Sequence, residues 1–231
     1  MRGLGSLHGP PRPRRFPRVP APRHPARQRA RHHFFGDDDY ALYRDLLGEH
    51  CQVAGVEIWA WVLMPNHVHL ILVPNDGDGL RRALAAVHRR YAGHVHARLK
   101  RTGHFWQGRF GCVAMDEAHL GAALRYVALN PVRAGLVQRA ADWPWSSVRA
   151  QLGAGDGVTS TAPVRERFPD FAALLAAGED EEMTRRLRRA ETIGRPLGSE
   201  DFLRRLERDS GRALAPAKRG RRRREISALS P

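Results

Sequence analysis

Two apolar segments joined by a two-residue turn constrain the fold of this chain more than any other feature. Residues 56–64 (VEIWAWVLM) and 67–73 (HVHLILV) are rich in β-branched and aromatic side chains, and Pro65-Asn66 between them is a turn signal. Two strands with two residues between them predict an antiparallel hairpin. The chain therefore contains a β-sheet, and an all-helical fold is excluded.

Helical periodicity flanks the hairpin on both sides. Apolar residues recur every three or four positions in residues 37–50 and 80–99, and three aspartates open the first of these segments. A third strand is predicted over 105–115, followed by a helix over 117–129 that ends at Asn130-Pro131. The order α-β-β-α-β-α from residue 37 onward predicts an α+β fold.

Segments outside this block differ in composition. Residues 1–33 hold seven Pro and nine Arg without hydrophobic periodicity, which is typical of a disordered segment. Gly, Ala and Thr dominate residues 150–163 and predict a linker. Short helices are predicted over 164–176, 180–191 and 199–210. The chain is therefore divided into a disordered segment (1–33), a domain (34–150), a helical C-terminal extension (164–210) and a basic tail (211–231).

The formal net charge of +15 favours a polyanionic partner. Residues 37–150 carry only +2 of it, so the excess lies in the extensions, which are either solvated and disordered or in contact with nucleic acid. No run of about 18 apolar residues is present, so no membrane span is expected. Two cysteines are too few for a disulfide framework and fit a reducing compartment.

His67-Val68-His69 is the first motif that can carry chemistry. On a strand, residues two apart face the same way, so both imidazoles can reach one divalent metal ion, while Val68 and Leu70 face the opposite side. Packing or a surface pair is the alternative. His94-Val95-His96 repeats the pattern within a predicted helix, where residues two apart diverge, and should not chelate.

Tyr126 and Asn130 form the second motif, four residues apart and thus on one helical face. A phenol beside an amide oxygen suits a nucleophile next to a metal ligand, although a tyrosine needs activation because its ordinary pKa is near 10. The alternative is a core tyrosine. For Tyr40, Tyr43 and Tyr91, core packing is the favoured interpretation.

Four linked motifs resemble one family. The segments MPNHVHLIL, GHFWQGRF, RYVALNPVRAGLV and DWPWSS, in this order, are similar to those of the single-tyrosine HUH transposases, in particular the REP-associated tyrosine transposase branch. The resemblance covers about residues 34–151. A looser likeness continues over residues 188–207.

The resemblance implies a fold and a reaction. The fold would be a ferredoxin-like central antiparallel sheet with helices on one face. His67 and His69 would hold a Mg²⁺ or Mn²⁺ ion, Asn130 would be the third metal ligand, and Tyr126 would be the nucleophile. The reaction would be cleavage and strand transfer of single-stranded, hairpin-forming DNA through a 5′-phosphotyrosine intermediate, without a nucleotide cofactor.

Further DNA-binding candidates come from their chemistry. Trp106, Gln107 and Arg109 combine an aromatic ring, an amide and a cation, a set suited to base stacking and phosphate contact, or else they belong to the strand core and its solvated edge. Arg133 could contact phosphate or the carbonyls at the end of its helix. We expect a monomer or homodimer in the bacterial cytoplasm, associated with the nucleoid and not with a membrane.

One departure from the family favours a second interpretation. Family members begin with a strand that is central in the sheet, and no such strand is recognisable in residues 1–33, which would leave its neighbours with exposed hydrogen-bonding edges. A non-catalytic nucleic-acid-binding relative, decayed or domesticated, is therefore the alternative function. A two-metal phosphohydrolase is disfavoured because the expected Asp and Glu ligands are missing.

Overall fold

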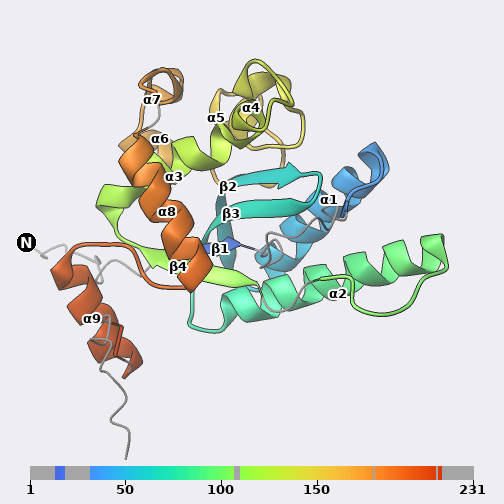
Figure 1. The fold of residues 1–231 in the computed structure, drawn as a ribbon, viewed down its shortest axis with the longest axis horizontal. Coiled ribbons are helices and arrows are strands. Elements are labelled where there is room, and N and C mark those ends of the chain that lie inside the picture. Colours follow the sequence, from blue (N-terminus) through green and yellow to red (C-terminus); the bar gives the residue numbers. More distant parts are fainter. Residues whose placement is uncertain (1–13, 19–31, 107–109, 179, 212, 215–231) are drawn as a thin grey trace, which may run out of the picture.

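A four-stranded antiparallel sheet forms the centre of the computed structural model, which describes residues 14–18, 32–106, 110–178, 180–211 and 213–214 (Figure 1). The strand order is β2-β3-β1-β4. The strands are β1 (Arg14–Arg18), β2 (Val56–Met64), β3 (His67–Pro74) and β4 (Gly111–Met115). The predicted hairpin is confirmed, since Met64 pairs with His67 beside the turn and Val56 pairs with Pro74 at the open end.

Strand β1 corrects the expectation that residues 1–33 lack a first strand, while residues 1–13 and 19–31 lie outside the described residues. It lies between β3 and β4 and is antiparallel to both, with Arg15 opposite Leu72 and Arg18 opposite His69. The sequence RRFPR gave no strand signal because Pro17 lacks a backbone N–H and argues against a central strand. The neighbouring strands supply the pairing that propensity does not.

The long helices were predicted to within a few residues, and their bounds are α1 (Asp37–Val53), α2 (Gly79–Leu99), α3 (Glu117–Ala128), α8 (Glu181–Ile193) and α9 (Glu200–Ser210). The predicted helix over 164–176 is instead two helices, because Pro169 interrupts it. The predicted strand over 105–115 begins only at Gly111. The short helices are α4 (Asn130–Arg133), η1 (Ala140–Asp142), α5 (Val148–Gln151), α6 (Ala162–Arg167) and α7 (Phe171–Ala176).

Helices cover both faces of the sheet, which corrects the expectation of helices on one face. Val68, Leu70 and Leu72 of β3 pack with α1 and α2 in one apolar cluster. Ile71 of the same strand packs with α3 and α8 in the other. β2 is buried along nearly its whole length, as a strand covered on both faces must be. Figure 1 shows α1 and α2 on one side of the sheet and α3 and α8 on the other.

Segments that follow α4 cover both edges of the sheet. At the β2 edge, the backbone N–H groups of Ser147 and Ser160 donate to the carbonyls of Trp61 and Ile58. At the β4 edge, Leu197 exchanges backbone hydrogen bonds with Ala114 and Asp116. Residues 150–163 are therefore docked on the sheet and do not act as a free linker, and the edges are protected. In the described part of the chain, every helix is too short or too polar to cross a membrane.

Candidate functional site

The histidine pair projects from one face of β3, as strand alternation predicts. The ring centroids of His67 and His69 lie 4.8 Å apart, with the rings nearly perpendicular. His69 is buried, with 1% of its surface exposed, whereas His67 is partly exposed. On the side of the sheet covered by α3 and α8, here called the α3–α8 face, His67 therefore lies nearer the surface and His69 lies in the interior.

Both imidazoles have Nδ1 next to an oxygen atom. Nδ1 of His67 is 2.7 Å from the amide oxygen Oδ1 of Asn66, and Nδ1 of His69 is 3.1 Å from Oε1 of Glu191. An oxygen of this kind accepts hydrogen bonds, which favours for each imidazole the tautomer that carries its hydrogen on Nδ1. Histidines that bind metal ions almost always donate their second ring N–H in this way.

The donor set fits a divalent cation with mixed nitrogen and oxygen ligands. Within the described residues, no group of three or more His, Cys, Asp or Glu side chains is arranged to hold a metal ion. A cation between His67 and His69 would therefore take its remaining ligands from other groups. Asn130 is buried and begins α4, one turn beyond Tyr126, and its amide oxygen is a suitable donor for Mg²⁺ or Mn²⁺.

Tyr126 lies in the last turn of α3, facing the histidine strand. The helix begins at Asp116, whose side chain accepts a hydrogen bond from the backbone N–H of His119. The Tyr126 ring is 5.3 Å from the His69 ring, measured between centroids, and the residue is 4% exposed. The helix thus places the predicted nucleophile near the predicted metal ligands, on the side of the sheet to which both histidines point.

Glu191 of α8 is a residue of this site that the sequence analysis missed. Its Oε2 accepts a hydrogen bond of 3.4 Å from the Tyr126 hydroxyl, while its Oε1 faces His69. The carboxylate is buried and lies between the predicted nucleophile and a histidine. One signal was present: Glu191 follows Leu187 by four residues, and so places an acidic side chain on the apolar face of its helix.

Arg133 reaches back from α4 to the tyrosine. Its Nη2 donates a 2.7 Å hydrogen bond to the Tyr126 carbonyl, and its guanidinium carbon lies 4.3 Å from the centre of the tyrosine ring. Of the two interpretations of Arg133, this contact matches the one with carbonyls at the end of the helix. The contact with phosphate stays a prediction.

Trp106, another DNA-binding candidate, does not join this site. Trp106 packs on the α1–α2 face, where its indole N–H donates to the His88 carbonyl at 2.9 Å. That contact matches the core interpretation of this residue. Gln107 and Arg109 lie outside the described residues.

The remaining tyrosines form a contrasting group in the α1–α2 core. Burial, and then the nearby Asp37 and Asp39, raise the pKa of Tyr40 to about 12. Burial also raises the pKa of Tyr43 and Tyr91 well above the ordinary range of a tyrosine. These phenols resist ionisation, which disfavours them as nucleophiles. The helical location of His94 and His96 on α2 is confirmed as well.

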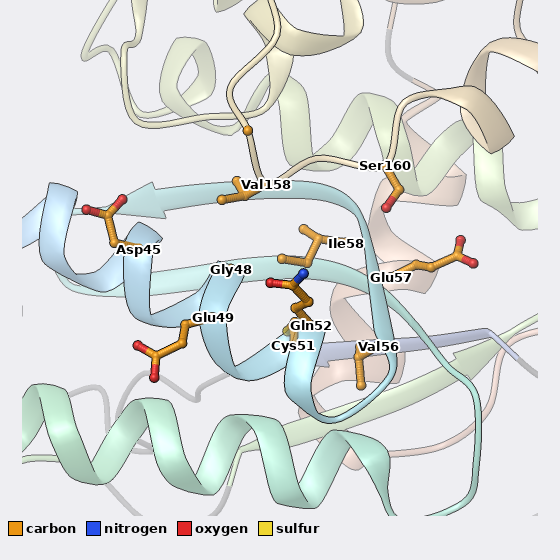
Figure 2. Close-up of a pocket in the computed structure, with 11 residues that line it drawn as sticks. Asp45, Gly48, Glu49, Cys51, Gln52, Val56, Glu57, Ile58, Val158 and Ser160 are labelled. Atoms are coloured by element: carbon orange, nitrogen blue, oxygen red, sulfur yellow. The ribbon is translucent and has the colours of Figure 1, made fainter.

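A cleft of about 490 Å³ lies away from these residues, between α1, β2 and the chain around Val158 (Figure 2). Asp45, Glu49 and Glu57 supply carboxylates to its lining. An acidic cleft repels phosphate groups, so this hollow does not suit a nucleic-acid backbone.

Comparison with known proteins shows which family the segment with this site resembles. Residues 26–130, which carry the histidine pair, Tyr126 and Asn130, match the family described as "Transposase IS200 like". The match covers less than half of the chain, and it shows that this segment is similar to that family.

Two individual proteins are similar to part of this chain. The chain is 31% identical over 105 residues to the REP-associated tyrosine transposase of Escherichia coli, which is 43% of this chain and 58% of that protein. It is 26% identical over 116 residues to a Haemophilus influenzae protein provisionally given the same name, which is 46% of this chain and 66% of that protein. The matched segment thus spans less than two thirds of either relative.

A solved structure shares the fold. It is a REP-associated tyrosine transposase bound to a REP hairpin, with a TM-score of 0.50 and 21% sequence identity. The match covers 67% of this chain and 87% of that chain. At this identity the likeness establishes the arrangement of helices and antiparallel strands.

Proposed function

We propose that this protein cleaves and rejoins single-stranded DNA through a covalent bond to Tyr126, with a divalent cation held by His67, His69 and Asn130. The proximity of the Tyr126 ring to the His69 ring, 5.3 Å across the α3–α8 face, carries the proposal. A nucleophile acting beside a metal ion must lie within a few ångströms of the ligands, and the other described tyrosines pack on the opposite face.

The reaction follows from the chemistry of the phenol. The Tyr126 hydroxyl loses its proton, and its oxygen attacks phosphorus as the bond to the 3′ oxygen breaks. The 3′ oxygen takes up a proton, and the 5′ phosphate remains linked to the tyrosine. A bound Mg²⁺ or Mn²⁺ would neutralise charge on the scissile phosphate. The phosphotyrosine ester conserves the bond energy, so a 3′-hydroxyl can reverse the step without a nucleotide cofactor.

The substrate class that we propose is single-stranded DNA with a hairpin. The solved neighbour is bound to a REP hairpin, and both curated relatives carry REP-associated names. The partly exposed His67 marks the side from which a strand would enter. Arg133 lies beside the tyrosine, where its cation favours a nearby phosphate.

A covalent trapping assay tests the function. The full chain is incubated with labelled single-stranded hairpin DNA and Mn²⁺, and the reaction is resolved under denaturing conditions. The wild-type chain should form a labelled protein adduct, and Tyr126→Phe should form none. DNA that binds without any adduct would favour the non-catalytic relative.

A further inference from the structure

We propose that Glu191 of α8 is a positioning residue of this centre, which holds His69 in the tautomer that leaves Nε2 for the cation and also orients the Tyr126 hydroxyl. The inference rests on the proposed function and deepens it. Glu191 lies outside residues 26–130, the segment that matches the transposase family. The C-terminal part of the chain would thus complete a site that the family segment begins.

The geometry joins three elements through one carboxylate. Oε1 of Glu191 is 3.1 Å from Nδ1 of His69 on β3, and Oε2 is 3.4 Å from the Tyr126 hydroxyl on α3. All three residues are buried, with exposed fractions of 6% or less. Oε1 of Glu191 and Nδ1 of His69 are close but not aligned as a hydrogen bond in this structure, and a small rotation of either side chain would form one. In such a low-dielectric setting that hydrogen bond would restrain its partners more strongly than it would in water.

The chemistry of the carboxylate fixes the role. A carboxylate oxygen accepts hydrogen bonds, so its position 3.1 Å from Nδ1 favours the His69 tautomer with hydrogen on that nitrogen. The other nitrogen, Nε2, then carries no hydrogen, and a carboxylate beside Nδ1 makes an imidazole a better metal ligand. Oε1 of Glu191 faces Nδ1 of His69, which is not the nitrogen offered to the cation, so the proposal places Glu191 behind the ligand and not on the metal.

The packing of α8 supports a fixed part of the site and not a displaceable cover. Leu187 and Ala190, on the same helix, are buried in the core cluster of the α3–α8 face. The chain after α8 is tied to β4, since the backbone N–H of Leu197 donates to the Ala114 carbonyl at 2.8 Å. Moving α8 away would expose apolar side chains and break sheet hydrogen bonds.

A metal-free measurement tests the tautomer directly. Long-range ¹H–¹⁵N spectra of the histidine rings, recorded on the full chain without metal, should show His69 protonated at Nδ1. Glu191→Ala should shift His69 toward a mixture of tautomers, whereas Glu182→Ala should leave the spectrum unchanged. Glu182 is the matched control because it lies on the same helix but is exposed. An unchanged His69 spectrum in Glu191→Ala would overturn the proposal.

Metal affinity gives the second measurement. Mn²⁺ titration of the DNA-free chain should show binding about 10- to 100-fold weaker in Glu191→Ala than in the wild type. Glu191→Gln keeps an acceptor oxygen but loses the charge, so it should show a smaller loss. This second variant decides the question if the alanine variant does not fold. Unchanged affinity in a folded variant, or faster DNA cleavage on removal of the side chain, would contradict a positioning role.

The two proposals fail separately. A wild-type chain that binds Mn²⁺ but forms no DNA adduct would refute the proposed reaction, while the tautomer and affinity measurements would still decide the role of Glu191. A wild-type chain that forms the adduct, together with a Glu191→Ala variant unchanged in spectrum and affinity, would refute the positioning role alone.

Discussion

The two faces of the sheet bury tyrosines in opposite chemical surroundings. On the α1–α2 face, Tyr40, Tyr43 and Tyr91 lie among other aromatic rings; Tyr43, for example, meets the ring of Tyr91 edge to face at 5.2 Å. On the α3–α8 face, Tyr126 lies among an imidazole, a carboxylate and a guanidinium. Tyr43 also meets an imidazole, since its hydroxyl lies 3.1 Å from Nε2 of His88, so the carboxylate and the guanidinium are what set the surroundings of Tyr126 apart.

The difference has a thermodynamic side. A phenol among aromatic rings contributes packing and pays a desolvation cost if it ionises, which raises its pKa. Buried polar groups, by contrast, are costly unless they are satisfied, so a cluster of them in a core points to function. The α1–α2 face should accordingly respond to mutation in stability, and the α3–α8 face in activity.

The largest expected effect is on DNA cleavage, and it compares the two copies of the His-Val-His motif. His67→Ala or His69→Ala should lower DNA cleavage by about three orders of magnitude, because the loss of a metal ligand removes several kcal/mol of charge stabilisation in the transition state. DNA binding should weaken only modestly. The matched variant His96→Ala, on helix α2, should leave cleavage largely intact. Single-turnover cleavage at saturating Mn²⁺ measures both, and strong cleavage by either strand variant would remove the metal site from the account.

The second expected effect is a pH dependence of the free energy of unfolding, and it arises from His88 on the α1–α2 face. Burial, and then the nearby His33, lower the pKa of His88 to about 4 from its ordinary value of 6.5. Its neutral form is therefore favoured in the folded state, and its contribution to stability is complete above pH 6.5 and is lost as the pH falls toward 4. Between pH 7 and pH 4.5 the free energy of unfolding should fall by on the order of 2–3 kcal/mol from this group.

Denaturant titrations at the two pH values check this prediction. His88→Gln should lose most of that dependence, and His94→Gln, an exposed residue on the same helix, should keep it. Equal pH dependence in both variants would show that another group is responsible.

A third, smaller effect tests the helix geometry on the α3–α8 face. Asn130→Ala should raise the Mn²⁺ concentration needed for half-maximal cleavage by about tenfold, because the two histidines remain while one oxygen donor is lost. Cleavage measured across a series of Mn²⁺ concentrations provides the value. A cleavage rate that is lower at every concentration, with the same metal requirement, would assign Asn130 a role other than metal binding.

The smallest expected effect concerns the salt dependence of DNA binding. It tests whether the basic C-terminal residues contribute to DNA binding in addition to the α3–α8 face. Deleting residues 215–231 removes six Lys and Arg residues and leaves every described helix and strand. Each phosphate contact on single strands contributes about −0.7 to the slope of log K against log salt, so the slope should become flatter by up to about four. An unchanged slope would place the DNA contacts within the described part. The N-terminal segment cannot be deleted in this way because it contains β1.

Local patterns predicted much of this molecule. The hairpin, the long helices and the shared face of His67 and His69 follow from periods of two and of three to four residues. Strand β1 escaped because Pro17 and the surrounding arginines oppose the conformation that two neighbouring strands impose. Glu191 was not predicted as a residue of the site because its partners lie more than 60 residues away in sequence, and no local pattern indicates such a contact.

The most direct test of the account is to locate the DNA-linked residue. The wild-type chain is reacted with single-stranded hairpin DNA and Mn²⁺, the adduct is digested with protease and nuclease, and the modified peptide is sequenced by mass spectrometry. The account predicts a nucleotide on Tyr126 and no adduct from Tyr126→Phe, while Tyr43→Phe retains it. A nucleotide on Tyr40, Tyr43 or Tyr91 would contradict the assignment of the α3–α8 face as the reactive one.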